Sequence, residues 1–204
     1  MNKIDLHHGD CLISMKEMND NEFDLAIVDP PYGLGKKVVN SGGRFKRYEN
    51  GCVNWDMDVP SDEYFNELFR VSKNQIIWGG NYFNLPPHRC FIVWDKQQPI
   101  GISFAMAELA WTSFDTVSQI FKMNSRNQKN RFHPTQKPVK LYEWILDNYA
   151  KQGDKILDTH LGSGSIAIAC HNRKFDLTAY EIDKDYFEAA SKRLKQHQQQ
   201  LTMF

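Results

Sequence analysis

Short apolar runs alternate with amphipathic segments along most of the chain. The runs at 25–28 and 75–78 have the length of buried strands, and turn-forming residues follow each of them. The segment 137–150 instead has apolar residues at helical spacing, with polar residues between them. Strands that alternate with helices predict an α/β fold with a doubly wound, mostly parallel sheet of the Rossmann-like kind.

The same patterns predict the order of the elements. Strands are expected at 4–7, 23–28, 75–78, 90–94, 155–157 and 177–180, and helices at 12–18, from 61 onward, and at 137–150, 166–172 and 185–199. Residues 105–110 fit a helix turn or a strand, and residues 116–123 fit a strand or one arm of a hairpin. Residues 33–59 lack periodicity, which predicts a long functional or mobile loop. No repeat or domain boundary interrupts the chain, so a single domain over 1–204 is expected.

Composition narrows the class of protein. The 204 residues are 41% hydrophobic and 25% charged, as in ordinary soluble globular proteins. No apolar run approaches membrane-spanning length, and the N-terminus lacks a secretory pattern. The four cysteines are far apart, and no group of His, Cys and Asp has metal-ligand spacing. These features predict a cytoplasmic protein that binds neither a membrane nor a metal.

The distribution of charge is more informative than the net charge, which is zero and does not by itself indicate a nucleic-acid binder. No acidic residue occurs between Thr116 and Lys140. This stretch and the one after residue 33 each hold a basic cluster. Their candidate phosphate contacts are Lys36, Lys37, Arg44, Lys46, Arg47, Lys122, Arg126, Lys129 and Arg131. A solvated surface is the alternative interpretation.

The motif Asp29-Pro30-Pro31-Tyr32 follows the apolar run 25–28 directly. Two prolines neither continue a strand nor enter a helix, so the chain leaves the sheet as a stiff turn. Ligands bind at the carboxyl ends of strands in open α/β sheets. Asp29 and the Pro30 carbonyl suit the two hydrogens of an exocyclic amine, and the Tyr32 ring suits stacking on a planar base. On these four residues alone, an ordinary surface turn remains the alternative.

A second group of residues has the order expected of a nucleotide site. Asp158 ends a predicted strand, and the turn Gly162-Ser163-Gly164-Ser165 leads into a helix, where glycine permits close approach to a ligand. Glu181 ends the next strand and can hydrogen-bond a ribose. Together these pieces favour a nucleoside-containing cofactor, although each alone fits an ordinary turn. Asp10, at a strand–helix junction, fits either a helix N-cap or a ligand-facing carboxylate.

Taken together, these motifs resemble those of the DNA amino-methyltransferases, in the circularly permuted (beta) group whose catalytic motif precedes its cofactor motif. The resemblance extends from Ile4 to Leu194. Residues 29–32 match the family's D-P-P-Y, and residues 158–165 match its S-adenosylmethionine loop, D-x-F-x-G-S-G-T. The specific hexapeptide at 133–138 resembles H-P-T-x-K-P, which borders the methionine pocket. His160 and Ser165 depart from the loop, where Phe and Thr are usual.

The resemblance implies a class I methyltransferase fold and a site-specific adenine-N6 DNA methyltransferase that acts on a flipped base in duplex DNA. The implied catalytic residues are Asp29, Pro30, Pro31 and Tyr32. The implied residues for S-adenosylmethionine are Asp10, Cys11, Asp29, His133, Lys137, Asp158, His160, Gly162, Ser163, Gly164, Ser165, Glu181 and Ile182. Target recognition is expected at about 114–131, and a homodimer is possible. A bacterial or phage-infected cell, with a role in restriction–modification, is the expected setting.

Three alternatives stay open from the sequence. Asp rather than Ser at position 29 favours adenine, but N4-cytosine methylation is the nearest alternative. Methylation of an amine or amide on RNA or protein would use the same cofactor fold. The departure at His160 also leaves room for a nucleic-acid-binding module without turnover.

Overall fold

A computed structural model describes residues 2–34, 59–99, 101, 105–124, 132–133 and 135–201. Their strands form a sheet in the order β1-β8-β7-β2-β3-β5-β4-β6. All of its strand pairs are parallel except those that β5 makes with β3 and β4. The strands are β1 (Ile4–His8), β2 (Phe23–Val28), β3 (Ser72–Trp78), β4 (Phe91–Asp95), β5 (Ala107–Thr112), β6 (Gln119–Lys122), β7 (Lys155–Asp158) and β8 (Asp176–Glu181).

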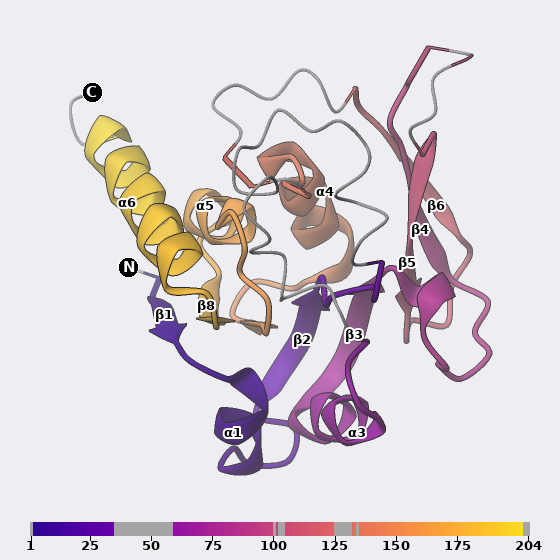
Figure 1. The fold of residues 1–204 in the computed structure, drawn as a ribbon, viewed down its shortest axis with the longest axis horizontal. Coiled ribbons are helices and arrows are strands. Elements are labelled where there is room, and N and C mark those ends of the chain that lie inside the picture. Colours follow the sequence, from indigo (N-terminus) through magenta and orange to yellow (C-terminus); the bar gives the residue numbers. More distant parts are fainter. Residues whose placement is uncertain are drawn as a thin grey trace.

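Helices cover both faces of this sheet. Figure 1 shows α4, α5 and α6 grouped on one side, with α1 and α3 on the other. The helices are α1 (Cys11–Lys16), α3 (Asp62–Val71), α4 (Val139–Tyr149), α5 (Ser165–Arg173) and α6 (Lys184–Leu201), and η3 (Gly80–Tyr82) is a short 3-10 turn after β3. Within the described residues, no helix combines the length and apolar character needed to cross a membrane.

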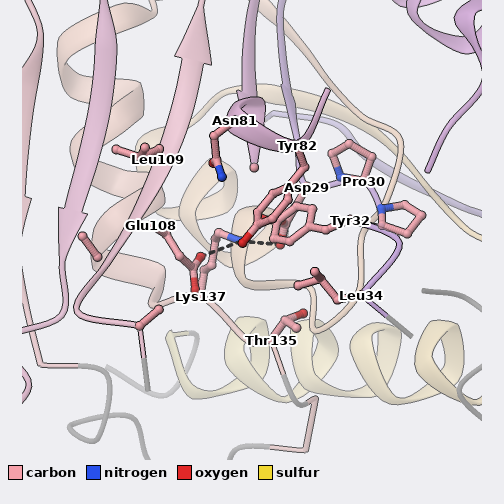
Figure 2. Close-up of a pocket in the computed structure, with 14 residues that line it drawn as sticks. Asp29, Pro30, Tyr32, Leu34, Asn81, Tyr82, Glu108, Leu109, Thr135 and Lys137 are labelled. Atoms are coloured by element: carbon pink, nitrogen blue, oxygen red, sulfur yellow. Dashed lines mark hydrogen bonds and ion pairs between the residues drawn. The ribbon is translucent and has the colours of Figure 1, made fainter. Parts of the chain in front are cut away.

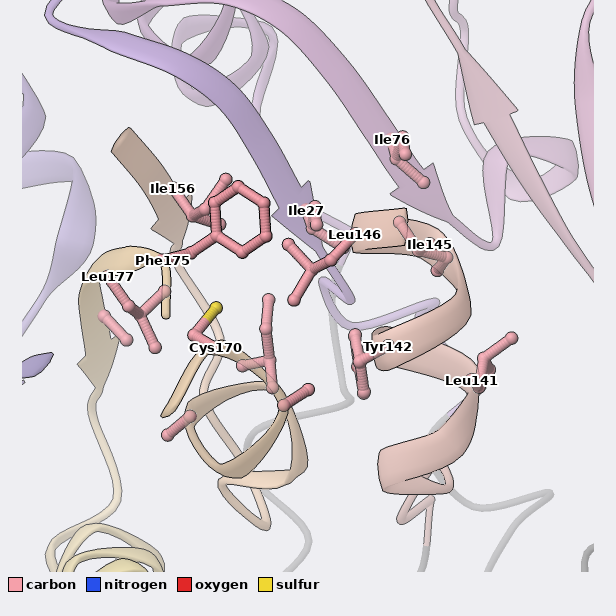
Figure 3. Close-up of a cluster of buried hydrophobic side chains, with 14 of the residues drawn as sticks. Ile27, Ile76, Leu141, Tyr142, Ile145, Leu146, Ile156, Cys170, Phe175 and Leu177 are labelled. Carbon is pink, nitrogen blue, oxygen red and sulfur yellow. The ribbon is translucent and has the colours of Figure 1, made fainter. Parts of the chain in front are cut away.

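The central strand β2 is buried on both faces of the sheet. Successive side chains of a strand point to opposite faces. Leu25 and Ile27 accordingly pack under α4 and α5, whereas Ala26 and Val28 pack against α1 and α3. Figure 3 shows the first of these two cores, with Ile27 among apolar side chains of α4, α5 and the neighbouring strands. A strand that is buried on both faces has a continuous apolar sequence, without alternating polar residues.

The topology has its switch point between β7 and β2, where a ligand crevice is expected in sheets of this kind. These strands are parallel neighbours, with Leu25 opposite Ile156 and Ala26 opposite Leu157. The chain leaving β7 enters α5 and then β8, whereas the chain leaving β2 continues through α3 to β3 on the other side. Connections that diverge in this way open a gap at the carboxyl ends of the strands, the usual ligand position in such sheets. Asp29 and Asp158 both lie at this edge.

The predicted doubly wound, mostly parallel fold is confirmed. The two ambiguous segments are both strands, because 107–112 pairs with β3 and β4, and 119–122 pairs in parallel with β4 rather than forming a hairpin arm. The predicted strand 75–78 begins earlier, at Ser72, and the predicted helix 137–150 begins later, since Pro138 is its N-cap. The predicted loop at 33–59 lies almost wholly outside the described residues.

Candidate functional site

The carboxylate of Asp29 is engaged on both of its oxygens. The Tyr32 hydroxyl donates to Oδ1 at 2.5 Å, and the Lys137 ammonium contacts Oδ2. The side chain is only 15% exposed, so both contacts form away from bulk water. Two segments that are 108 residues apart in sequence, the D-P-P-Y turn and the H-P-T-x-K-P hexapeptide, therefore meet at one carboxylate.

Lys137 lies between two carboxylates rather than in a simple pair. Its Nζ is 3.2 Å from an oxygen of Glu108 on β5, and Lys96 contacts the other Glu108 oxygen. Lys137 is 2% exposed and lies 5.0 Å from the centre of the Trp78 ring. Burial acts to lower the pKa of Lys137, but Asp29 and Glu108 together raise it above its ordinary value. The ammonium is therefore charged at neutral pH.

Glu108 is held in its charged form by the two lysines that it contacts. Burial acts to raise the pKa of Glu108, but the charges of Lys137 and Lys96 hold it below its ordinary value. Glu108 is thus an anion at neutral pH. The cluster carries two carboxylates and two ammonium groups in a poorly hydrated place, where each charge acts strongly on the others.

Asp29, Glu108 and Lys137 line a cavity of about 260 Å³ at the carboxyl ends of β2 and β3. Figure 2 shows Asp29, Tyr32, Tyr82, Glu108 and Lys137 converging on it, with the Asn81 amide at its rim. The walls combine two tyrosine rings, two prolines and aliphatic groups with a few charged atoms. A mostly apolar cavity with a few convergent polar groups suits a planar, polar ligand.

The ring of Tyr32 is held by its neighbours. It stacks on Tyr82, with ring centres 4.9 Å apart and planes 15° apart. On Gly79, a Cβ atom would lie 2.2 Å from Tyr32 Cε1, and this glycine has φ +70°. Only glycine therefore satisfies both the backbone conformation and the space that the ring takes. Tyr32 was predicted to stack on a base, and here its ring stacks on Tyr82 while its hydroxyl reaches Asp29.

The predicted cofactor turn is hydrogen-bonded to the carboxylate of Glu181. Glu181 Oε2 accepts from the Gly162 N–H at 2.7 Å, and Oε1 accepts from the Asp183 N–H at 2.9 Å. Burial raises the pKa of Glu181. Gly162 and Gly164 have φ +52° and +70°, and a Cβ on Gly164 would lie 3.1 Å from Ala190 Cβ on α6. These contacts join β8, the turn and α6 into one unit.

The serines of the turn face inward. Arg193 donates to the Ser163 carbonyl at 2.8 Å and to Ser165 Oγ at 3.0 Å, and the two serine hydroxyls lie 3.1 Å apart. Ser165 stands where threonine is usual in the resembling family. The hydroxyl that both residues share is the group that Arg193 contacts, so this departure keeps the hydrogen bond.

Asp158 ends β7 in a buried position, 3% exposed. Burial raises its pKa to about 8, although the His160 N–H donates to Oδ1 at 3.0 Å and partly offsets this effect. His160 itself lies between Thr159, whose Oγ1 is 2.9 Å from Nδ1, and the ring of Tyr64 on α3. Burial lowers the pKa of His160 to about 4, so it is a neutral ring at pH 7 in the place where phenylalanine is usual.

The remaining predicted cofactor residues follow the carboxyl ends of β1 and β8 or lie next to the Gly162 turn. A Cβ on Gly162 would lie 3.6 Å from the His133 ring, which also packs on Tyr186. Asp10 caps α1 by accepting from the Leu12 N–H at 2.8 Å, which confirms the N-cap interpretation. The buried thiol of Cys11 follows it, and Ile182 next to Glu181 is 60% exposed.

The predicted DNA contacts are mostly beyond the part of the chain that the structure describes. Lys122 is exposed at the end of β6, on the edge of the sheet. The residues outside the described ranges are Lys36, Lys37, Arg44, Lys46, Arg47, Arg126, Lys129 and Arg131. Within the described ranges, no group of three or more His, Cys, Asp or Glu residues is arranged to hold a metal ion.

The sequence analysis missed several lining residues of the cavity, among them Asn81, Tyr82 and Glu108. Asn81 and Tyr82 follow the glycine pair that ends β3, a turn signal that was read only as a strand end. Glu108 is an isolated acid within the apolar stretch 107–111. An acid in a buried strand is costly unless it is paired, and that signal could have marked it as functional.

Comparisons with known proteins agree with this geometry. A family model described as DNA methylase matches residues 58–192. The Type II methyltransferase M.HpaI of Haemophilus parainfluenzae is 24% identical over 231 residues, covering 91% of this chain and 72% of that protein. The M1.HpyAVI–SAM complex has a TM-score of 0.63 at 22% identity, covering 94% of this chain and 100% of the other. The PvuII DNA methyltransferase (cytosine-N4-specific) has a TM-score of 0.65 at 13% identity, with coverages of 94% and 86%. At these identities the two structures indicate a shared fold.

Proposed function

The chain belongs to the DNA methylase family, and from that premise we propose that it transfers a methyl group from S-adenosylmethionine to N6 of adenine in duplex DNA. The observation that carries the proposal is the position of Asp29 and Asp158 at the ends of the parallel neighbours β2 and β7. A base-binding carboxylate and a cofactor turn are then next to each other across one crevice. The motif order, catalytic before cofactor, supports placing the chain in the circularly permuted (beta) group.

The residues on the β7 and β8 side fit S-adenosylmethionine. The cofactor carries positive charge on its sulfur and ammonium groups and has a ribose diol. The buried carboxyl group of Asp158 suits the positive charge, and Glu181 next to the Gly162 turn suits the ribose. His133 borders this side, since its ring lies next to the Gly162 turn. When bound, S-adenosylmethionine supplies a methyl group activated by its positive sulfur.

The residues on the β2 and β3 side act on the base. The exocyclic amine of adenine is a weak nucleophile because its lone pair is delocalised into the ring. Hydrogen bonds from this amine to Asp29 and to the Pro30 carbonyl direct the nitrogen lone pair and stabilise positive charge as it develops. Holding the amine in line with the methyl group supplies much of the remaining rate enhancement. A base inside a duplex is out of reach, so it must be flipped out into the cavity that Tyr32 and Tyr82 line.

Substitution of Asp29 tests this proposal. Asp29→Ala removes the group that touches the reacting amine, so kcat should fall by about a hundredfold or more. Calorimetric affinity for S-adenosylmethionine should stay within a few-fold of the wild type. Asp147→Ala, which removes an exposed aspartate on α4 paired with Arg173, is the control and should keep wild-type kcat. Wild-type turnover in Asp29→Ala would refute the mechanism.

N4-methylation of cytosine is the second candidate. The DNA methylase family covers both N6 and N4 chemistry, and one of the similar folds is a cytosine-N4-specific enzyme. Both bases present an exocyclic amine beside a ring nitrogen, so Asp29 and Pro30 could hold either. Asp at position 29 supports adenine. Mass analysis of nucleosides from treated DNA separates the two, because N6-methyladenine supports the proposal and N4-methylcytosine overturns it.

A further inference from the structure

In the free protein, Lys137 occupies the Asp29 carboxylate that the amine of the base would bind. Lys137 contacts one oxygen of Asp29, and the Tyr32 hydroxyl donates to the other. A neutral donor such as tyrosine leaves the negative charge in place. An ammonium ion in a buried site neutralises it. The charge of Asp29 is what stabilises the developing positive charge on the amine, so a tight Asp29–Lys137 pair opposes the reaction.

Glu108 gives Lys137 a second carboxylate partner. The Lys137–Glu108 distance is 3.2 Å, so the ammonium is already shared in the free protein. Glu108 is itself fixed by Lys96, which is 15% exposed and contacts its other oxygen. The Trp78 ring lies 5.0 Å from Nζ and limits where the ammonium can go. A short displacement therefore transfers Lys137 from one carboxylate to the other without exposing it.

We propose that Glu108 is a positioning residue that draws Lys137 off Asp29 when a base amine enters the cavity. The inference rests on the proposed function and adds a residue and a step to it. Glu108 acts through Lys137, so its effect falls on turnover. Because the exchange replaces one ion pair by another, the cluster keeps its charge balance as the amine binds. Without the charge of Glu108, the ammonium of Lys137 stays paired with Asp29, and the negative charge of Asp29 stays neutralised.

The variant Glu108→Gln tests the inference, since it keeps the size of the side chain and removes its charge. We expect kcat for DNA methylation to fall about ten- to a hundredfold, less than from removing a group that touches the reacting amine. The KM values for S-adenosylmethionine and DNA should change by no more than about twofold, because the loss falls on the transition state. Glu108→Asp restores the charge and should give a kcat between those of the wild type and Glu108→Gln.

A matched control removes a different buried carboxylate. Glu143 on α4 is 5% exposed in its side chain and accepts from Asn172 Nδ2 at 2.7 Å, away from the cavity. Glu143→Gln should keep wild-type kcat. If it loses kcat as Glu108→Gln does, then the loss comes from a generally weakened structure and the inference is wrong.

The outcomes separate this inference from the proposed function. A wild-type protein that methylates neither base in DNA refutes the proposed function itself. An active wild type with Glu108→Gln at the same kcat refutes only the role of Glu108. A Glu108→Gln protein that loses S-adenosylmethionine binding together with kcat has a structural role for Glu108, which also refutes the inference. Only a fall in kcat with near-constant KM values, reversed in part by Glu108→Asp, supports it.

Discussion

At the scale of single residues, the proposed function predicts that the buried carboxyl group of Asp158 makes cofactor binding depend on pH. Burial raises its pKa from 3.8 to about 8, so the group is protonated in the free protein at neutral pH. A bound cation next to it favours the carboxylate, and binding then releases a proton. We expect affinity for S-adenosylmethionine to increase about tenfold per pH unit from about pH 6 to pH 7.5 and to level off above about pH 8. Titration calorimetry at several pH values measures this.

The isosteric variant Asp158→Asn is the comparison for this prediction. It cannot ionise, so its weaker affinity should hardly change over the same range. The free protein offers a second measurement. Between pH 3.8 and about 8, native Asp158 holds a proton that the unfolded chain has released, so its contribution to the free energy of unfolding falls as pH rises. A wild-type affinity that does not vary with pH would contradict the placement of Asp158 beside a positive group.

Gly79 is the residue on which the position of the Tyr32 ring depends. Gly79→Ala adds a Cβ that would lie 2.2 Å from the ring, in a backbone with φ +70°. We expect the free energy of unfolding to fall by about 1–2 kcal/mol from the backbone and by about 1–3 kcal/mol more from the clash. Gly153→Ala is the control, since its φ is +95° and nothing lies within 4 Å of an added Cβ. Equal losses in thermal unfolding of the two variants would show that the ring contact contributes nothing.

At the scale of elements, the sequence predicted the strands and helices that their own hydrophobic pattern is enough to indicate. The all-apolar run of β2 and the helical spacing of α4 each indicate one structure, because both faces of the strand and one face of the helix are buried. The start of α3 was also a local signal, since a helix was expected from residue 61 onward and Ser61 caps it by accepting from the Tyr64 N–H at 3.3 Å. The D-P-P-Y turn followed from the inability of proline to continue a strand.

The elements that could not be predicted depend on distant partners. Residues 105–110 contain three alanines and no clear period, so neither helix nor strand is favoured locally. Their strand state comes from pairing with β3 on one side and β4 on the other. The same holds for the site: Lys137 was assigned to the cofactor from its hexapeptide, but its contacts with Asp29 and Glu108 join three segments whose proximity no spacing in the sequence reveals.

At the scale of the whole molecule, the proposed function divides the site into two halves on either side of the switch point between β7 and β2. The cofactor half uses the β7 and β8 ends, the glycine turn and α6, and it is tied together by Glu181 and Arg193. The base half uses the β2, β3 and β5 ends with Tyr32, Tyr82 and Glu108. The two halves are built on opposite sides of the diverging connections. A change in one half should therefore leave ligand binding in the other half nearly intact.

Thermal unfolding with and without S-adenosylmethionine tests this separation. At a hundredfold excess over Kd, the cofactor should add about 2.7 kcal/mol to the free energy of unfolding of the wild type. Each kcal/mol should raise Tm by about 2–4 °C. Glu181→Gln weakens the bond to the Gly162 turn, and a tenfold loss of affinity would remove about 1.4 kcal/mol of that gain. Tyr82→Ala should keep the full cofactor-dependent gain but lower kcat/KM for DNA about tenfold, since it removes an aromatic wall from the base half. If Tyr82→Ala abolished the gain, or Glu181→Gln left it unchanged, the cofactor and the base would not occupy separate halves of the crevice.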